Sequence, residues 1–167
     1  SAPRRETVAV TGEWMVEFEP NRGAPASVRM PELISWTRHP DPGVQYFSGT
    51  ARYRNRFTLP AGWLGSRVEL DLGRLWTIGE ARLNGKTLGI LWTPPYVADA
   101  TAALRAGENE LTVEVTNVWF NRLIGDARGV GPRRITRTNV TGSGFKPWKT
   151  LEPLESGLFG PVRLVRV

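Results

Sequence analysis

Residues 68–96 read VELDLGRLWTIGEARLNGKTLGILWTPPY, and this stretch decides the fold class that the sequence predicts. At its start, apolar Val68, Leu70 and Leu72 alternate with two acidic residues. A period of two is typical of a strand with one buried and one solvated face. The pattern therefore predicts a strand that ends at Gly73.

A hairpin follows in the same stretch. Alternation resumes over residues 80–83, and Asn84-Gly85 then forms a two-residue turn signal, because both residues adopt positive φ at low cost. The return run ends at Pro94-Pro95, which lack the amide protons that a sheet ladder needs. It places three apolar residues on one expected face: Leu88, Ile90 and Trp92. The stretch thus predicts three strands of one antiparallel sheet.

The same alternation recurs on both sides of this stretch. It marks further strands with inward-facing Trp14, Val16 and Phe18; Ala51, Tyr53, Phe57 and Leu59; Leu111, Val113 and Val115; and Val162 and Leu164. Residues 20–45 are rich in proline and are expected to form an irregular surface connection that contains Trp36 and His39. One short helical turn is predicted between Asp99 and Gly107. Many short strands with one helical turn favour an all-β fold with antiparallel sheets, a jelly-roll β-sandwich.

Length and composition favour a single domain over residues 1–167. The chain has 167 residues, 40% hydrophobic content and seven tryptophans, which suffice for one core. No run of apolar residues is long enough to span a bilayer, and no signal peptide is recognisable, so a soluble domain is expected. A start at Ser1 without methionine suggests a piece of a larger multidomain enzyme. The lack of cysteine excludes disulfides, thiolate zinc sites and cysteine nucleophiles.

Positive charge is concentrated between residues 120 and 150, where no periodicity persists. This segment holds seven Lys and Arg against Asp126 alone, which accounts for the whole net charge of +6. A loop of this length without regular structure is often functional. Its charge favours a carboxylated or sulfated polymer as ligand, although arginines that stabilise the loop or face a neighbouring domain explain the charge equally well.

Aromatic residues near polar groups are the second indication of a ligand. Sugar rings stack on flat apolar side chains, and their hydroxyls bind planar acceptors and donors. The candidate carbohydrate-binding residues are Trp76, Trp119, Asn121, Arg122, Asp126, Arg133, Arg134 and Trp148. Burial is an equally good explanation for the three tryptophans in this set. Trp14 and Trp92 lie in alternating strands and are predicted to belong to the core.

Four segments resemble the galactose-binding-like jelly-roll domain. They are YFSGTARYRNRFTLP, ELDLGRLWTIGEARLNGKTLGILWTPPY, LRAGENELTVEVTNVWFNRLIGD and SGLFGPVRL, which lie between about Tyr46 and Val167. This domain is called the sugar-binding domain in family 2-type glycoside hydrolases and related α-L-rhamnosidase-like proteins, and NRLIGD most resembles the rhamnosidase type. The resemblance implies an accessory domain beside a separate catalytic domain, and it assigns no role to the region before Tyr46.

Intrinsic catalysis is not expected. A Ser-His-Asp triad would have to use His39, and Ser143 lies in TGSGF, which lacks the nucleophile-elbow spacing. No cluster has transition-metal spacing and no cofactor is predicted, although a structural calcium ion held by carbonyls is compatible with the fold. Nucleic acid is the rival ligand for a basic, aromatic chain, but no RNP, KH or helix-turn-helix signature is present.

The sequence therefore predicts a non-catalytic carbohydrate-binding module, secreted or periplasmic in a bacterium. Its expected partners are a plant or algal polysaccharide, acidic and pectin-type or rhamnose-containing, and the catalytic domain of a parent glycoside hydrolase. Neither nucleic acid nor a membrane is expected as a partner. The alternative is a structural accessory domain that packs on the catalytic domain and binds no glycan itself.

Overall fold

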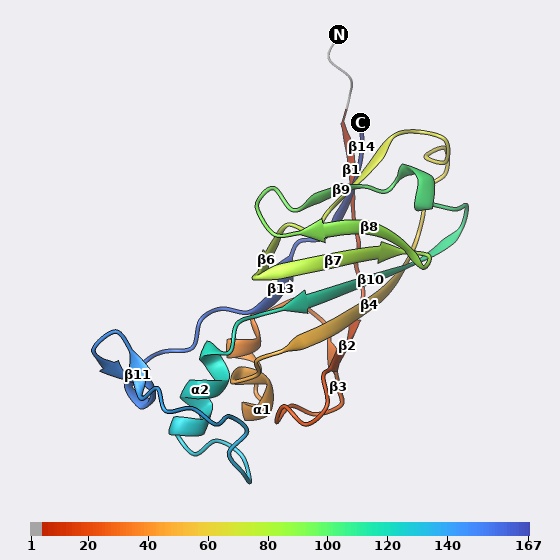
Figure 1. The fold of residues 1–167 in the computed structure, drawn as a ribbon. Helices are drawn as coiled ribbons and strands as arrows, with labels where there is room; N and C mark the ends of the chain where they lie inside the picture. The colour runs from red at the N-terminus through yellow and green to blue at the C-terminus, as the bar shows by residue number, and fades with distance from the viewer. Residues whose placement is uncertain (1–4) are drawn as a thin grey trace.

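A six-stranded antiparallel sheet forms one layer of the fold (Figure 1). The computed structural model describes residues 5–167. In spatial order the strands of this sheet are β3 (Ser27–Met30), β2 (Trp14–Phe18), β4 (Thr50–Thr58), β10 (Glu108–Thr116), β7 (Ile78–Leu83) and β8 (Lys86–Leu91). The alternating patterns of β2, β4, β7 and β10 are those expected from the sequence, and the predicted all-β class is confirmed.

A second antiparallel sheet packs on the first and completes the sandwich. Its order is β1 (Glu6–Ala9), β14 (Arg163–Arg166), β5 (Val68–Asp71) and β9 (Val97–Asp99). Two small ribbons join the layers or extend from them: β6 (Arg74–Trp76) with β13 (Gly157–Gly160), and β11 (Gly142–Ser143) with β12 (Lys146–Pro147). Buried side chains from both sheets, such as Val113 and Leu70, meet in one hydrophobic cluster.

The stretch that predicts the fold does not stay in one sheet, which corrects the expectation of three strands side by side. β5 belongs to the four-stranded sheet, whereas β7 and β8 belong to the six-stranded sheet, and β6 crosses between the layers. The turn itself is as predicted, because Asn84 and Gly85 have φ values of 51° and 80°. Sequence alternation therefore located the strands but not their sheets.

A β-bulge in β8 overturns the predicted burial of Trp92. Ala81 pairs with Gly89 and Arg82 with Thr87, so Leu88 is an extra residue. An extra residue reverses which side chains face inward. Leu91 consequently packs on the core, while its neighbours Ile90 and Trp92 point outward and are 64% and 70% exposed.

Two segments expected to be irregular contain regular structure. Residues 20–45 include β3, the 3-10 helix η1 (Trp36–Arg38) and the helix α1 (Pro42–Gln45), and Trp36 is fully buried. Residues 120–150 begin with helix α2 (Phe120–Ala127) and end with the 3-10 helix η3 (Trp148–Thr150). The predicted turn after Asp99 is the 3-10 helix η2 (Thr101–Ala103). Within residues 5–167, no helix has the length and apolarity needed to cross a membrane.

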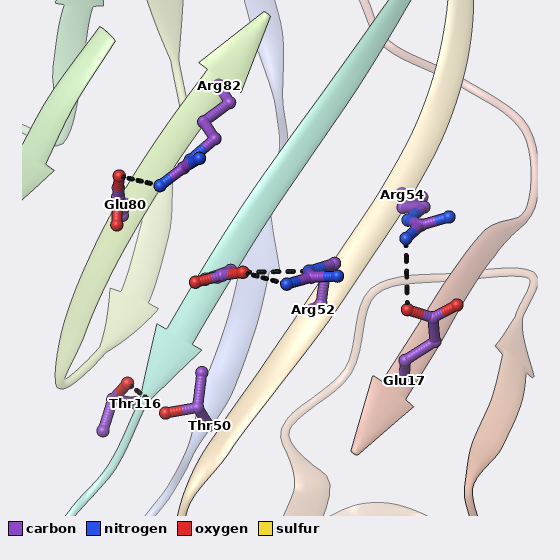
Figure 2. Close-up of polar contacts among 8 residues, drawn as sticks. Glu17, Thr50, Arg52, Arg54, Glu80, Arg82 and Thr116 are labelled. Carbon is purple, nitrogen blue, oxygen red and sulfur yellow. Dashed lines mark hydrogen bonds and ion pairs between the residues drawn. The ribbon is translucent and has the colours of Figure 1, made fainter. Parts of the chain in front are cut away.

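The outer face of the six-stranded sheet is polar, as the alternating arginines predict (Figure 2). The Nε and Nη2 atoms of Arg52 donate to Glu114 on the neighbouring strand at 2.9 and 2.7 Å, and Thr50 and Thr116 bond at 2.8 Å. Two further ion pairs lie beside them, Arg54 with Glu17 and Arg82 with Glu80.

We expect the Arg52 and Glu114 pair to contribute little to stability because both side chains reach solvent. A double-mutant cycle with Arg52→Ala and Glu114→Ala should give a coupling free energy of about 0.2–1 kcal/mol from urea unfolding. The coupling should shrink as salt screens the charges. A coupling of several kcal/mol, unaffected by salt, would show that the pair is effectively buried.

Candidate functional site

The most suitable binding surface is a cleft of about 350 Å³ around Trp76, which we call the Trp76 cleft. β6 and β13 form its base, and Leu75 and Leu158 pair there and are buried. Because side chains alternate along a strand, Trp76 is turned outward and is 47% exposed. Its strand partner is Gly157, where an added side chain would meet the buried Trp36 and Tyr53.

The walls of the Trp76 cleft are mostly apolar. Pro94 and Tyr96 come from the segment before β9, Leu154 comes from the segment before β13, and Phe159 comes from β13 itself. Two charged groups complete the lining: Arg74 Nη2 lies 3.5 Å from Glu155 Oε2, and the Arg74 guanidinium lies 5.4 Å from the centre of the Phe159 ring. Apolar walls with a few polar groups are typical of small-molecule sites of this size.

Trp119 is also accessible, but it does not line the Trp76 cleft. It precedes α2 and is 45% exposed. The Arg22 guanidinium lies 4.3 Å from the centre of its ring, and Arg22 is held by Glu19 at 2.9 Å. One face of the indole is therefore covered by a cation. A ligand contact at Trp119, which stays a prediction, would have to use the uncovered part of the ring.

Asn121 is buried and has a structural role instead of the predicted contact with sugar hydroxyls. Its Nδ2 donates to the Leu154 carbonyl at 2.8 Å and to Ser156 Oγ at 3.1 Å, and its Oδ1 accepts from the Leu154 amide at 2.8 Å. These bonds use the whole amide group. Asn121 consequently holds the segment that supplies Leu154 and Glu155 to the Trp76 cleft.

Arg122 and Asp126 form a buried ion pair, so Asp126 is not free to bind a hydroxyl as predicted. Arg122 Nη2 lies 3.0 Å from Asp126 Oδ1, and both side chains are almost completely inaccessible. Asp126 also accepts from the amides of Ile135 and Thr136 and from the Thr136 hydroxyl. Burial raises the pKa of Asp126, but the bonds from Thr136 and Ile135 and the charge of Arg122 outweigh it, so the pKa is lowered overall.

Trp148 and the exposed arginines complete the predicted set. Trp148 is only 8% exposed, donates from Nε1 to the Val140 carbonyl at 2.8 Å and packs edge-on against Phe120 at 5.5 Å. It therefore stabilises the long loop and is unavailable for stacking on sugar. Arg133 and Arg134 are exposed. The structure thus does not bring the eight predicted residues together in one site.

The sequence did not indicate the other residues of the Trp76 cleft. Arg74, Tyr96, Glu155 and Phe159 come from segments up to 85 positions apart, and only the folded chain brings them together. The one local signal is the alternation of Leu158 with Phe159 in SGLFGPVRL, which predicts an outward-facing aromatic residue.

Across residues 5–167, no group of three or more His, Asp or Glu side chains is arranged to hold a metal ion. His39 lies outside the Trp76 cleft, and its Nδ1 accepts from the Asp41 amide at 3.0 Å. Burial lowers the pKa of His39, against an opposing effect of Asp41.

Comparison with known proteins relates the chain to parts of larger enzymes. It is 38% identical over 180 aligned residues to a protein of Formosa agariphila named as a candidate beta-glucuronidase, and the match covers 95% of this chain and 16% of that protein. The structure matches the rhamnosidase from Novosphingobium sp. PP1Y with a TM-score of 0.89 and 38% identity, over 99% of this chain and 15% of that one. The chain corresponds to one domain of larger glycoside hydrolases.

The structure also resembles part of a third, longer enzyme. The beta-glucuronidase of Ruminococcus gnavus matches with a TM-score of 0.59 and 25% identity, over 70% of this chain and 22% of that one. No protein-family model matches the sequence. The chain spans about one sixth of the length of the first two relatives, so the similarity extends to a domain-sized part of each and not to the whole enzyme.

Proposed function

We propose that the chain is a non-catalytic accessory domain of a glycoside hydrolase, with a galactose-binding-like jelly-roll fold, and that it binds polysaccharide in the Trp76 cleft. The observation that carries this proposal is the half-exposed Trp76 indole, which forms an uncovered wall of a cleft beside an Arg74–Glu155 pair. The apolar and polar groups of the cleft support sugar binding, and the small share of each relative that the chain covers supports an accessory role.

The cleft has the two kinds of group that a sugar requires. The Trp76 ring offers a flat apolar surface on which the C–H face of a pyranose stacks, and Phe159 adds an apolar wall. Arg74 and Glu155 offer donors and acceptors for hydroxyls. A shallow site of this size buries little area, so we expect dissociation constants in the micromolar to millimolar range, as an order of magnitude.

The lack of a carboxylate pair in the cleft supports a non-catalytic role. Most glycosidases use two carboxyl groups about 5–10 Å apart. Glu155 is the sole acid in the cleft lining of the described chain, and it is paired with Arg74. Two of the relatives are named as a rhamnosidase and a candidate beta-glucuronidase, and the chain matches only about one sixth of each. Catalysis would then belong to the rest of such an enzyme.

Replacing Trp76 tests this proposal. Trp76→Ala should weaken retardation of the chain by a polysaccharide in affinity electrophoresis by about tenfold or more, because stacking area and its associated attraction are lost. The panel should contain neutral and acidic soluble polysaccharides. Trp92→Ala is a matched control, since Trp92 is more exposed than Trp76 but does not line the cleft. Equal retardation of the Trp76→Ala variant and the unsubstituted chain would overturn the proposal.

One observation favours a second candidate, a domain that packs on its catalytic domain without binding glycan. Ile78, Ile90 and Trp92 are all exposed in or next to the neighbouring strands β7 and β8. Exposed apolar groups of this kind are common at interfaces between domains or proteins. If every polysaccharide failed to retard the unsubstituted chain, this surface would become the better supported functional feature.

A further inference from the structure

A second hollow lies at the end of the molecule that carries α1 and α2, away from the chain termini (Figure 1). Its volume is about 460 Å³, within the range of small-molecule sites. Its lining consists of residues 21, 23–24, 42–43, 122, 130–133 and 135, and Pro42, Pro132 and Ile135 give it apolar walls. No acidic residue belongs to this lining, whereas Arg122 and Arg133 both do.

Arg122 supplies a buried positive group to this hollow. Its side chain is 1% exposed, and Nη2 is used by Asp126 and by the Val130 carbonyl at 3.0 Å. Nε has no hydrogen-bond partner among the described residues, which is unusual for a buried guanidinium. Asp126 balances the charge of Arg122, so the exposed Arg133 leaves the hollow with an excess of one positive charge.

Residues 129–149 form a segment that we call the cationic arm, and the first part of this segment also lines the hollow. It carries no acidic residue and five exposed cations: Arg133, Arg134, Arg137, Lys146 and Lys149. None of the five forms an ion pair within residues 5–167, although most other arginines of the chain do. The hairpin β11–β12 of the arm extends away from the sheets, with Phe145 fully exposed at its turn (Figure 1).

We propose that the hollow and the cationic arm form a second glycan site, selective for a polysaccharide that carries carboxylates on its sugar rings. This inference rests on the proposed function, because it assumes a domain that binds glycans. The carboxylate of one uronic acid residue enters the hollow beside Arg133 and Arg122, and its ring lies against Pro132 and Ile135. Neighbouring carboxylates meet the remaining cations of the arm.

Aromatic content favours an acidic glycan over nucleic acid. Arginine binds carboxylate and phosphate alike through two parallel hydrogen bonds, so the cations by themselves suit either polymer. Proteins that bind single strands combine a positive groove with several aromatic side chains for successive bases. The cationic arm has Phe145 as its one exposed aromatic residue, because Trp148 is buried. One ring supports a sugar contact better than a run of stacked bases.

Calorimetric titration with two forms of one polymer tests the proposal. Oligomers of polygalacturonate carry free carboxylates, and the same oligomers as methyl esters are neutral. We expect the chain to bind the free acid about tenfold or more tightly than the ester at low salt. The preference should fall as salt is raised, since part of the attraction comes from exposed charges. Equal affinity for acid and ester would overturn the inference.

Three single-charge variants locate the site. Arg133→Gln should weaken binding of the free acid about tenfold, because it removes a group that lines both the hollow and the arm. Lys146→Gln should cost about threefold or less, since a fully solvated lysine contributes only a weak, screened contact with a neighbouring carboxylate. Arg5→Gln removes an exposed charge directly before β1, a strand whose label lies far from α2 in Figure 1, and should leave affinity unchanged. Equal losses for Arg133→Gln and Lys146→Gln would indicate diffuse attraction and no defined site.

Further measurements distinguish a failure of this inference from a failure of the proposed function. Trp76→Ala should weaken binding of neutral glycans and keep the preference for the free acid over the ester. If Trp76→Ala weakens neutral binding but the chain shows no such preference, the proposed function stands and the second site is refuted. If no glycan binds, both are refuted. A single-stranded oligonucleotide that bound as tightly as the free acid at equal salt would overturn the selectivity for carboxylated sugars.

Discussion

Asp126→Ala is expected to lower the free energy of unfolding by about 3–5 kcal/mol, the range for removing one member of a buried ion pair. The variant leaves the Arg122 guanidinium buried without its counter-charge. It also removes the acceptor for the Ile135 amide at 3.1 Å and for the Thr136 amide at 2.6 Å. Urea unfolding followed by tryptophan fluorescence would measure the loss.

An exposed ion pair gives the matched control for this variant. Glu152 lies 3.2 Å from Arg128 and is 85% exposed, so Glu152→Ala should change stability by less than about 1 kcal/mol. A loss below 1 kcal/mol for Asp126→Ala would contradict the structural role assigned to the buried pair. It would mean that the start of the cationic arm detaches from α2 at little cost.

The lowered pKa of Asp126 also predicts how stability depends on pH. A carboxyl whose pKa is lower in the folded than in the unfolded chain stabilises the fold above its unfolded pKa of about 3.9. This contribution is lost as pH falls through the lower, folded value. Urea unfolding between pH 7 and pH 3 should therefore show the difference between the unsubstituted chain and Asp126→Asn shrinking in acid. A difference that stayed constant with pH would contradict the ionised state of Asp126.

Trp36→Ala should cost about 3–5 kcal/mol of stability, the typical range for truncating a buried aromatic residue. Trp36 is fully buried among Phe18 and Phe47, with ring centres 5.8 and 5.2 Å away. Its Nε1 donates to the Tyr53 hydroxyl, which also accepts from the Leu158 amide. Truncation would open a cavity and remove this donor. Denaturant unfolding would measure the change.

Trp92→Ala is the control with the same change of side chain. At 70% exposure we expect a change of about 0.5 kcal/mol or less, because little apolar contact is lost. A Trp92→Ala variant as unstable as Trp36→Ala would contradict the reversed face of β8 after its bulge.

These two tryptophans show where sequence patterns stop being informative. Alternation correctly predicted β2, β4, β5, β7 and β10, because the period of two is a local property of each strand. The same pattern placed Trp92 in the core, since a one-residue bulge is invisible in the sequence yet reverses every later side chain. Trp36 was assigned to a surface connection because its burial depends on Phe18 and Tyr53, which belong to strands β2 and β4.

Helix α2 was missed for a related reason. Its sequence FNRLIGDA contains glycine, asparagine and aspartate, which have low helix propensity. The bonds that occupy its polar side chains come from distant segments: Asn121 binds Leu154, and Asp126 binds Thr136. Polar residues near an aromatic residue predicted a ligand site, whereas the fold uses these groups to attach loops. Trp76 remains accessible because it alternates with the buried Leu75 in β6 and therefore faces outward.

Because β1 pairs with β14, the first and last strands lie side by side, which suits insertion of this fold into another protein. Glu6 lies opposite Arg166, and both chain ends emerge together at the pole opposite α2 and β11 (Figure 1). A host chain could leave and re-enter through neighbouring points, as in domains inserted into a surface turn. An insertion of this kind would not distort the sandwich. It would place the cationic arm at the end of the domain that lies farthest from the host protein.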